Sequence, residues 1–312
     1  MKLTPRKHVL VERADGIAWT YLNRPDKKNA MSPALHAEMA ATLDELEADP
    51  ETRVVVIAGA GGVFSAGQDL KEYFRALEND RPAAKRARLV SNGWQWDRLY
   101  MFDKPTIAMV EGFCIGGAFT HLLATDFAIA AETTTFSLSE VNWGILPGGM
   151  VSKAFADAVL YRHALYYACT GDAFDGKEAA RIGIINYAVP QPQLKAEVIK
   201  LAQKLMSKSP QALRATKQVV RLVRQMDFAQ AADYMQEKKT AIQVGDPDSS
   251  YQSGLHQFLD AKSYKPVYRP FERASGKRKA AAKPARGKAT ASAEATTKTV
   301  AKAATDRKRA RR

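Results

Sequence analysis

One carboxylate, Glu140, lies between two apolar runs in the segment TFSLSEVNWGILPGG, residues 135–149. The nearest other acidic residues along the chain are Glu132 and Asp157. A carboxylate placed in this way can act as a general acid or base. A structural interpretation competes, because Ser137 precedes Glu140 by three residues, as in the Ser-x-x-Glu capping box at helix starts. The segment alone does not decide between the two.

Two glycine-rich junctions could supply the partner for such a carboxylate. FSAGQDL (64–70) follows an apolar run, and GFCIGGAF (112–119) precedes one of helical type. Glycine permits tight turns, and a helix start leaves backbone N–H donors unpaired, so two converging junctions would form an oxyanion hole. Each junction alone is weak evidence, and GAGG at 59–62 lacks the spacing of a dinucleotide-binding fingerprint. The two together, followed by the Glu140 segment, favour an acyl-binding site.

The elements that must position these residues alternate between strands and helices. Two β-rich runs flank the turn 14–16 and predict a hairpin, and residues 32–49 predict a helix with Leu35, Met39, Leu43 and Leu46 on one side. Three apolar strands are expected within 53–59, 105–112 and 126–132. This order predicts an α/β fold with a sheet buried on both faces. Long amphipathic helices follow from about Gln191, so we expect a core over residues 1–190 and a helical subdomain over 191–268.

Composition narrows the class of protein. The 312-residue chain is 46% hydrophobic, with no apolar run long enough to span a bilayer and no signal peptide at its start, so we expect a cytoplasmic, globular protein. Cys114 and Cys169 both occur in apolar surroundings, which predicts reduced core thiols. The five histidines show no ligand-like spacing, and no metal site is expected.

The net charge of +14 is concentrated at one end of the chain. Residues 273–312 hold 14 Lys or Arg against two acidic residues, so this segment carries 12 of the net charges and the rest is nearly neutral. Its large apolar side chains are limited to Val300. Such a composition predicts a disordered basic tail with nonspecific affinity for polyanions. A nucleic-acid-binding protein is therefore one alternative class, resting on the tail alone.

Four motifs together resemble one family. LNRPDKKNAMS, FSAGQDLKEYF, PTIAMVEGFCIGGAF and FSLSEVNWGILPGG, in this order, are similar to the enoyl-CoA hydratase/isomerase (crotonase) family, and within it to the hydroxycinnamoyl-CoA (feruloyl-CoA) hydratase-lyases. The resemblance covers residues 9–266 and leaves the tail unexplained. It implies a crotonase-like spiral of repeated β-β-α units, a helical C-terminal trimerisation region, and a homotrimer or dimer of trimers.

The resemblance also implies roles for individual residues. The N–H groups of Gln68 and Gly117 would bind the thioester carbonyl. The residues implied in binding the CoA moiety or the acyl group are Lys27, Ala66, Leu70, Tyr73, Ser139, Trp143 and Gln236. Tyr73 would lie near a phenolic oxygen. Trp143 has core packing as its alternative, and Gln236 stands where better known members have a second tyrosine, which leaves the preferred ring substituent open.

The implied chemistry depends on a departure from the pattern of the simple hydratases. These enzymes place two glutamates over the double bond, whereas this chain has Glu140 at the later position and Thr120 at the earlier one. A hydroxyl cannot act as a carboxylate base near neutral pH, so Glu140 would perform the acid–base steps, with Thr120 at most orienting a water or hydroxyl. No cofactor is expected, since CoA is part of the substrate and its thioester accepts the electrons. A general enoyl-CoA hydratase or isomerase and a non-catalytic scaffold are the remaining alternatives.

Overall fold

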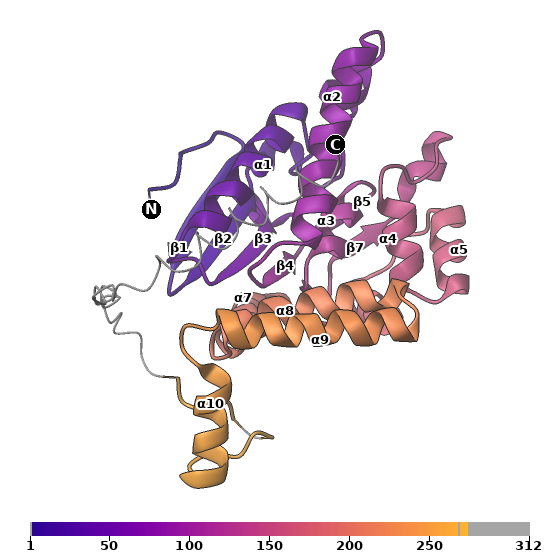
Figure 1. Ribbon diagram of the computed structural model, residues 1–312. Helices are drawn as coiled ribbons and strands as arrows, with labels where there is room; N and C mark the ends of the chain where they lie inside the picture. The colour runs from indigo at the N-terminus through magenta and orange to yellow at the C-terminus, as the bar shows by residue number, and fades with distance from the viewer. Residues whose placement is uncertain (1, 268, 274–312) are drawn as a thin grey trace, which may run out of the picture. The chain divides into compact units, whose positions relative to one another are not determined.

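The computed structural model describes residues 2–267 and 269–273 (Figure 1). Within this part of the chain, six strands form the main sheet in the order β1-β2-β3-β4-β6-β8. The strands of the main sheet are β1 (Val9–Ala14), β2 (Ile17–Leu22), β3 (Val54–Gly59), β4 (Thr106–Val110), β6 (Phe127–Ala131) and β8 (Tyr187–Val189). β1 and β2 are antiparallel, as expected for the predicted hairpin, and the other neighbours are parallel.

A second, two-stranded sheet gives the fold its repeat. β5 (Phe113–Ile115) pairs in parallel with β7 (Thr135–Ser137). The order β4, β5, α3 (Ala118–Ala124) is followed by β6, β7 and α4 (Val151–Ala158), so each repeat sends one strand to the main sheet and the next to the small one. The predicted β-β-α spiral is therefore confirmed.

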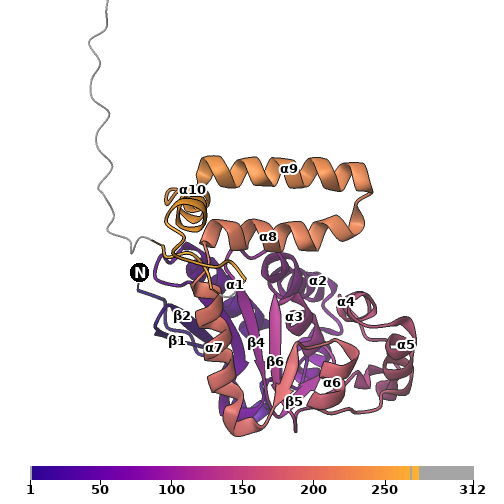
Figure 2. The ribbon, with the colours of Figure 1, turned by 90° about the horizontal axis from the view of Figure 1, so that it is seen from below.

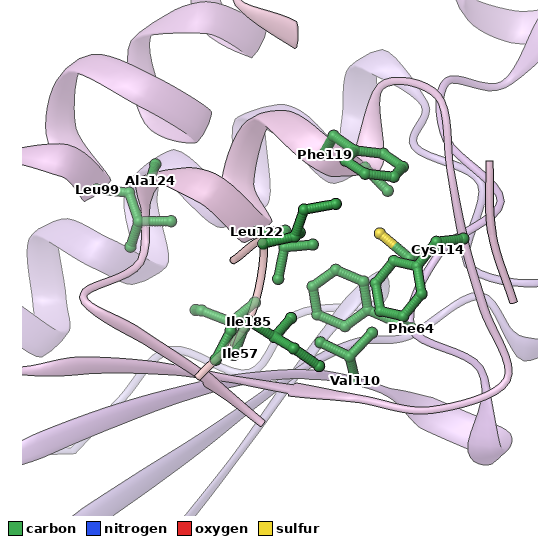
Figure 3. Packing of buried hydrophobic residues seen from close by; sticks show 14 of the residues in the cluster. Ile57, Phe64, Leu99, Val110, Cys114, Phe119, Leu122, Ala124 and Ile185 are labelled. Atoms are coloured by element: carbon green, nitrogen blue, oxygen red, sulfur yellow. The ribbon is translucent and has the colours of Figure 1, made fainter. Parts of the chain in front are cut away.

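Alternating side chains of the central strands explain why both faces of the main sheet are buried. Val55 and Ile57 of β3 enter a core with α1 (Pro33–Ala48) and α3, whereas Val54 and Val56 enter a second core against α7 (Leu194–Met206). Parallel strands covered on both faces read as continuous apolar runs, as β3 does. Figure 2 shows α7 beside the strands. Figure 3 shows the first core, which includes Phe64 from the first glycine junction and Cys114 and Phe119 from the second.

Helix α1 forms where the sequence predicted it. Ser32 accepts a hydrogen bond from the Leu35 amide at the first turn, and Pro33 occupies the first helical position, where its missing N–H costs nothing. The predicted apolar stripe of Leu35, Met39, Leu43 and Leu46 is fully buried.

Three of the remaining helices precede the last strand, β8, and three follow it. They are α2 (Arg81–Asn92), α5 (Tyr161–Thr170), α6 (Gly176–Ile182), α8 (Pro210–Leu222), α9 (Phe228–Gly245) and α10 (Ser250–Leu255). α8 and α9 run side by side (Figures 1 and 2). Helices thus follow β8 as expected, while the domain boundary at residue 190 stays a prediction. In the described ranges, no helix is long and apolar enough to cross a membrane.

Of the predicted basic tail, residues 273–312, the structure describes only Arg273. Arg273, which the sequence assigned to the tail, pairs with Asp248 and donates to the Lys208 carbonyl. The rest of the predicted tail, 274–312, lies outside the described residues.

Candidate active site

The two glycine-rich junctions lie side by side. The amide of Ser65 donates to the carbonyl of Phe113 over 2.9 Å, and the amide of Ile115 donates back to Ser65 over 3.1 Å. A Cβ atom on Gly67 would lie 2.6 Å from the Ile115 oxygen and 3.4 Å from the Gly117 nitrogen, and the φ of Gly67 is +87°. Only glycine fits such a close approach in this conformation. The junctions therefore converge, as the sequence predicted.

Where the two junctions meet, two backbone N–H groups have no acceptor among the described residues. Met31 forms an isolated β-bridge with the first junction. Its amide donates to the Gly67 carbonyl and its carbonyl accepts from the Asp69 amide, so the amide of Gln68, between them, takes no part in these bonds. Within the described part of the chain, the Gln68 and Gly117 amides donate to no protein group. Gly117 directly precedes α3, where free N–H groups are expected. Adjacent free donors are the geometry that an oxyanion hole requires.

A buried ion pair holds this loop in place. Arg24 donates to Asp69 over 2.9 Å, to Glu72 over 2.6 Å and to the Ala30 carbonyl over 2.7 Å. Asp69 also accepts from the amides of Lys71 and Glu72, capping the turn 70–74. Burial opposes ionisation of Asp69, but these backbone and arginine hydrogen bonds outweigh it and lower its pKa. Asp69, which directly follows Gln68, is therefore held both by Arg24 and by the turn 70–74.

Glu140 lies in a short helical turn, Ser139–Trp143, against the second junction. A Cβ atom on Gly116 would lie 2.9 Å from the Glu140 Oε1 atom. The Oε2 atom is buried without a hydrogen-bond partner among the described residues, and burial raises the pKa of the carboxyl. A desolvated carboxylate next to free N–H donors is suited to exchange protons with a bound acyl group.

The capping-box interpretation of Glu140 is wrong. Ser137 belongs to β7, and its hydroxyl donates to the Gly171 carbonyl over 3.1 Å. The residue that precedes the turn is Leu138, and no side chain caps it. Glu140 therefore does not act in a capping box with Ser137.

Thr120 lies on the first turn of α3. Its side chain is buried, and its amide donates to the Gly117 carbonyl over 3.2 Å. The helix that begins at the predicted oxyanion hole thus carries a hydroxyl where the simple hydratases are expected to carry a carboxylate.

The residues predicted to bind CoA surround the first junction. The Ala66 amide donates to the Lys28 carbonyl, which places the turn with Lys27 against the junction, and Lys27 itself is exposed. Leu70 is exposed at the start of the turn 70–74. Tyr73 lies in the same turn, half-buried, with burial raising the pKa of its phenol. These four predicted positions therefore belong to one region.

Three other predicted positions differ in their surroundings. Ser139 is half-buried next to Glu140. Trp143 is 66% exposed, so the core-packing interpretation is wrong for this chain. Gln236 is exposed on α9, and its side chain makes no hydrogen bond within the described residues. Among the described residues, no hydrogen bond therefore joins the Gln236 side chain to the other site residues.

A set of buried polar residues that the sequence did not predict contacts the Gln68 side chain. His36 on α1 contacts the Gln68 side chain at 2.7 Å, and the Trp94 indole donates to the other nitrogen of His36 at 2.8 Å. His121 on α3 is also fully buried, stacked on Phe64. The sequence did offer one sign of these residues, because His36 lies next to the apolar stripe of the predicted helix 32–49.

The cysteines only partly match their prediction. Cys114 is buried, and burial raises the pKa of its thiol, but Cys169 is exposed on α5, so the expectation of a core thiol is wrong there. Within residues 2–267 and 269–273, no group of three or more His, Cys, Asp or Glu side chains could hold a metal ion.

Comparisons with known proteins identify relatives of this chain. The hydroxycinnamoyl-CoA hydratase-lyase of Pseudomonas fluorescens is 46% identical over 268 residues, which cover 86% of this chain and 97% of the relative. A carnitinyl-CoA dehydratase of Escherichia coli K12 is 35% identical over 219 residues, covering 69% of this chain and 80% of the relative. An enoyl-CoA hydratase structure from Bacillus anthracis superposes with a TM-score of 0.75 at 27% identity, covering 86% and 99% of the two chains. Residues 12–268 match the enoyl-CoA hydratase/isomerase family, to which this chain belongs.

Proposed function

We propose that this protein is a hydroxycinnamoyl-CoA hydratase-lyase, which hydrates a 3-arylpropenoyl thioester and cleaves the product to an aromatic aldehyde and acetyl-CoA. The observation that carries the proposal is the single desolvated carboxylate of Glu140 beside two free N–H donors, with a hydroxyl at Thr120. The 46% identity to an enzyme of that name supports the choice of substrate.

The hydration step follows from these groups. The thioester carbonyl accepts hydrogen bonds from the amides of Gln68 and Gly117, which polarises the double bond and makes the benzylic carbon electrophilic. Glu140 removes a proton from a water that adds to this carbon, and then delivers that proton to the α carbon. A raised pKa suits both steps, because the same carboxyl must accept and return a proton.

The cleavage step uses the same residues. Glu140 removes the proton of the new β-hydroxyl, the bond between the α and β carbons breaks, and the aldehyde leaves. The bonding electrons form the enolate of acetyl-CoA, whose oxygen stays in the oxyanion hole. Protonation of the enolate carbon by Glu140 restores the carboxylate. No cofactor is required in this sequence, because the thioester accepts the electron pair.

We propose that the acyl and CoA contacts come from the residues around the first junction. Lys27 presents an exposed ammonium suited to a phosphate, Ala66 and Leu70 line the path of the thioester arm, and Tyr73 meets the ring oxygen. Ser139 and Trp143 flank Glu140. Gln236 would reach an acyl group from another chain, since its side chain is exposed on α9 and makes no hydrogen bond within the described residues.

A homotrimer or dimer of trimers is the assembly that we propose. Large apolar side chains are exposed on the described surface, most of all Phe228 of α9, at 96%. Exposed apolar side chains of this size favour burial in an interface. Light scattering should give the mass of three or six chains, and a monomer would contradict the assembly.

The function is tested by incubation of the protein with feruloyl-CoA. We expect vanillin and acetyl-CoA in equal amounts. Hydrated thioester without aldehyde would instead identify a general enoyl-CoA hydratase, and no reaction on either feruloyl-CoA or crotonyl-CoA would favour a non-catalytic scaffold.

A further inference from the structure

The Gln68 side chain lies against the other glycine of the predicted oxyanion hole. A Cβ atom on Gly117 would lie 3.0 Å from the Gln68 Cγ atom and 3.3 Å from its Nε2 atom. Both distances are shorter than the ordinary contact of about 3.5 to 4.0 Å between carbon atoms, so glycine at position 117 leaves the room that this side chain occupies. The position of the Gln68 side chain therefore contributes to the spacing between the two junctions, and with it to the spacing of the two free N–H donors.

Two hydrogen bonds hold the side-chain amide of Gln68. Its Oε1 atom lies 2.7 Å from the Nε2 atom of His36 on α1, and its own Nε2 atom donates to Ser91 Oγ, near the end of α2, over 3.3 Å. His36 and Ser91 are at most 1% exposed. Buried polar groups of this kind must satisfy one another, so the directions of their hydrogen bonds can be worked out.

The direction of the contact between His36 and Gln68 is set by Trp94. An indole N–H only donates, so the Nδ1 atom of His36, 2.8 Å away, accepts and carries no proton. The single proton of the ring is therefore on Nε2, and it is donated to Gln68 Oε1. Burial lowers the pKa of His36 to about 4, in agreement with a neutral ring near pH 7. The reverse orientation of the Gln68 amide would place two donors against each other.

The same set of hydrogen bonds reaches the helix that carries the second glycine junction. Gln95 donates through Nε2 to Ser91 Oγ over 2.7 Å and to the Ser91 carbonyl over 3.3 Å, which directs its Oε1 atom to the Nδ1 atom of His121, 3.2 Å away. His121 lies on α3, four residues after Gly117. With Gln68, the buried network thus consists of His36, Ser91, Trp94, Gln95 and His121.

We propose that His36 is a positioning residue of the oxyanion hole, whose Nε2 proton keeps the Gln68 side chain against Gly117 and so fixes the spacing of the two N–H donors. His36 acts through Gln68 and does not touch the substrate. An oxyanion hole stabilises the transition state through donors that are oriented beforehand, so loss of His36 should affect kcat more than KM. This inference rests on the proposed function, which assigns the oxyanion hole.

The first experiment measures how strongly the bound thioester carbonyl is polarised. In a Glu140→Gln background, the infrared band of cinnamoyl-CoA labelled with carbon-13 at this carbonyl is recorded free and bound. Two aligned donors should lower the frequency of the bound band. His36→Met keeps a side chain without a donor and should move the band at least halfway back to its free position. His36→Gln, whose amide can donate to Gln68 Oε1, should keep most of the lowering.

Turnover provides a second measure in protein that retains Glu140. We expect His36→Met to lower kcat for feruloyl-CoA about 5- to 20-fold, less than the roughly 10²- to 10³-fold effect of removing a donor outright, with KM within about 2-fold. Gln68→Met keeps the backbone N–H and removes the side-chain acceptor, so it should cause a similar loss. The double variant should lose no more than either single one, because both act through the same hydrogen bond.

The matched control is Thr42→Val on the same helix. Thr42 is also buried on α1, and its hydroxyl donates to the Glu38 carbonyl over 2.7 Å. The substitution removes one buried hydrogen bond from α1 without altering the donor to Gln68. Whatever its effect on Tm, Thr42→Val should leave the carbonyl band and kcat unchanged.

Four outcomes would overturn the inference. They are a carbonyl band and kcat that His36→Met leaves unchanged, additive losses in the double variant, an equal change in Thr42→Val, and a band that is not lowered in protein that retains His36. If His36→Met does not fold, Gln68→Met decides alone, and an unchanged band in that variant overturns the inference. The infrared measurement needs no turnover, so failure of the proposed function, seen as absence of vanillin from unaltered protein, is separately recognisable.

Discussion

The two halves of the candidate site differ in how completely their polar groups are satisfied. Behind Gln68, an ion pair and the buried network fix the loop, with hydrogen bonds at nearly every side chain. On the other side, the Glu140 carboxyl has an unpaired buried oxygen, and its neighbour Trp143 is exposed. The half with Gln68 is held in place by hydrogen bonds, whereas the half with Glu140 contains a carboxyl oxygen without a partner among the described residues.

This difference matches two chemical tasks. An oxyanion hole is effective when its donors are already oriented, because reorganisation during the reaction would cost free energy. A general base must instead remain available to change its protonation, and hydrogen bonds to the carboxylate would lower its pKa and weaken it. The comparison predicts that substitutions in the two halves will fail in different ways.

The largest effect is expected from Gly67→Ala in the rigid half. The new Cβ would lie 2.6 Å from the Ile115 oxygen, at a φ of +87°, so the junctions must separate. We expect kcat/KM for feruloyl-CoA to fall by about 10²- to 10³-fold, the scale of a lost oxyanion-hole donor. Gly62→Ala is the matched control, with a φ of +76° but nothing within 4 Å of its Cβ. An equal loss in both variants would show that backbone strain, not the hole, is responsible.

Gly116→Ala should affect the other half, with a smaller loss. Its Cβ would lie 2.9 Å from Glu140 Oε1, which must move, while the Gln68 loop is untouched. We expect kcat to fall by about 10-fold or more, with Kd for a nonreactive acyl-CoA within about 2-fold of its original value. Gly144→Ala, which also has a positive φ but open space at its Cβ, provides the control. A loss of binding in Gly116→Ala would mean that the halves are not separable.

The contributions of the two halves to folding stability should change in opposite directions with pH. Burial lowers the pKa of His36 to about 4 and that of His121 to about 3, so the unfolded chain binds their protons first, and stability falls as pH drops below about 6.5. Burial raises the pKa of Glu140 above its ordinary value of 4.5, so its contribution to stability falls as pH rises past 4.5.

Thermal unfolding at several pH values checks both signs. Glu140→Gln should raise Tm at pH 7, and the gain should shrink toward pH 4. His121→Asn should flatten the loss of stability between pH 6 and 4, by up to about 1.4 kcal/mol per pH unit for one proton. A Glu140→Gln variant that is less stable at pH 7 would contradict the assignment of an unsatisfied carboxylate.

The smallest effect is expected from the basic segment, which should influence neither half. Truncation after Arg273 keeps the contact with Asp248 and removes most of the predicted tail charge. Turnover should stay within about 2-fold, while salt-sensitive binding to a polyanion such as heparin should be lost. A folded, oligomeric truncated protein without activity would give the tail a catalytic or structural part.

The sequence predicted the features that depend on local pattern. The cap at Ser32, the stripe on α1 and the apolar run of β3 follow from spacing and residue type, and the glycines of both junctions indicated their convergence. The contact of His36 with Gln68 spans 32 residues and that with Trp94 spans 58, so both arise only once α1 packs against the first junction and the segment 93–98. Ser137 shows the converse, because a local capping pattern gave way to strand β7. Cys169 and Trp143 are exposed although each belongs to a segment rich in apolar residues, since exposure depends on which face of an element is covered.

The central claim is that one carboxylate, Glu140, performs the proton transfers of both steps. The most direct test supplies Glu140→Gln and Thr120→Ala with feruloyl-CoA and, separately, with the β-hydroxy thioester, and follows aldehyde release. We expect Glu140→Gln to lose at least about 10²-fold on each substrate and Thr120→Ala to lose much less. Cleavage of the β-hydroxy thioester by Glu140→Gln at the unaltered rate would contradict the claim, because another residue would then remove the hydroxyl proton.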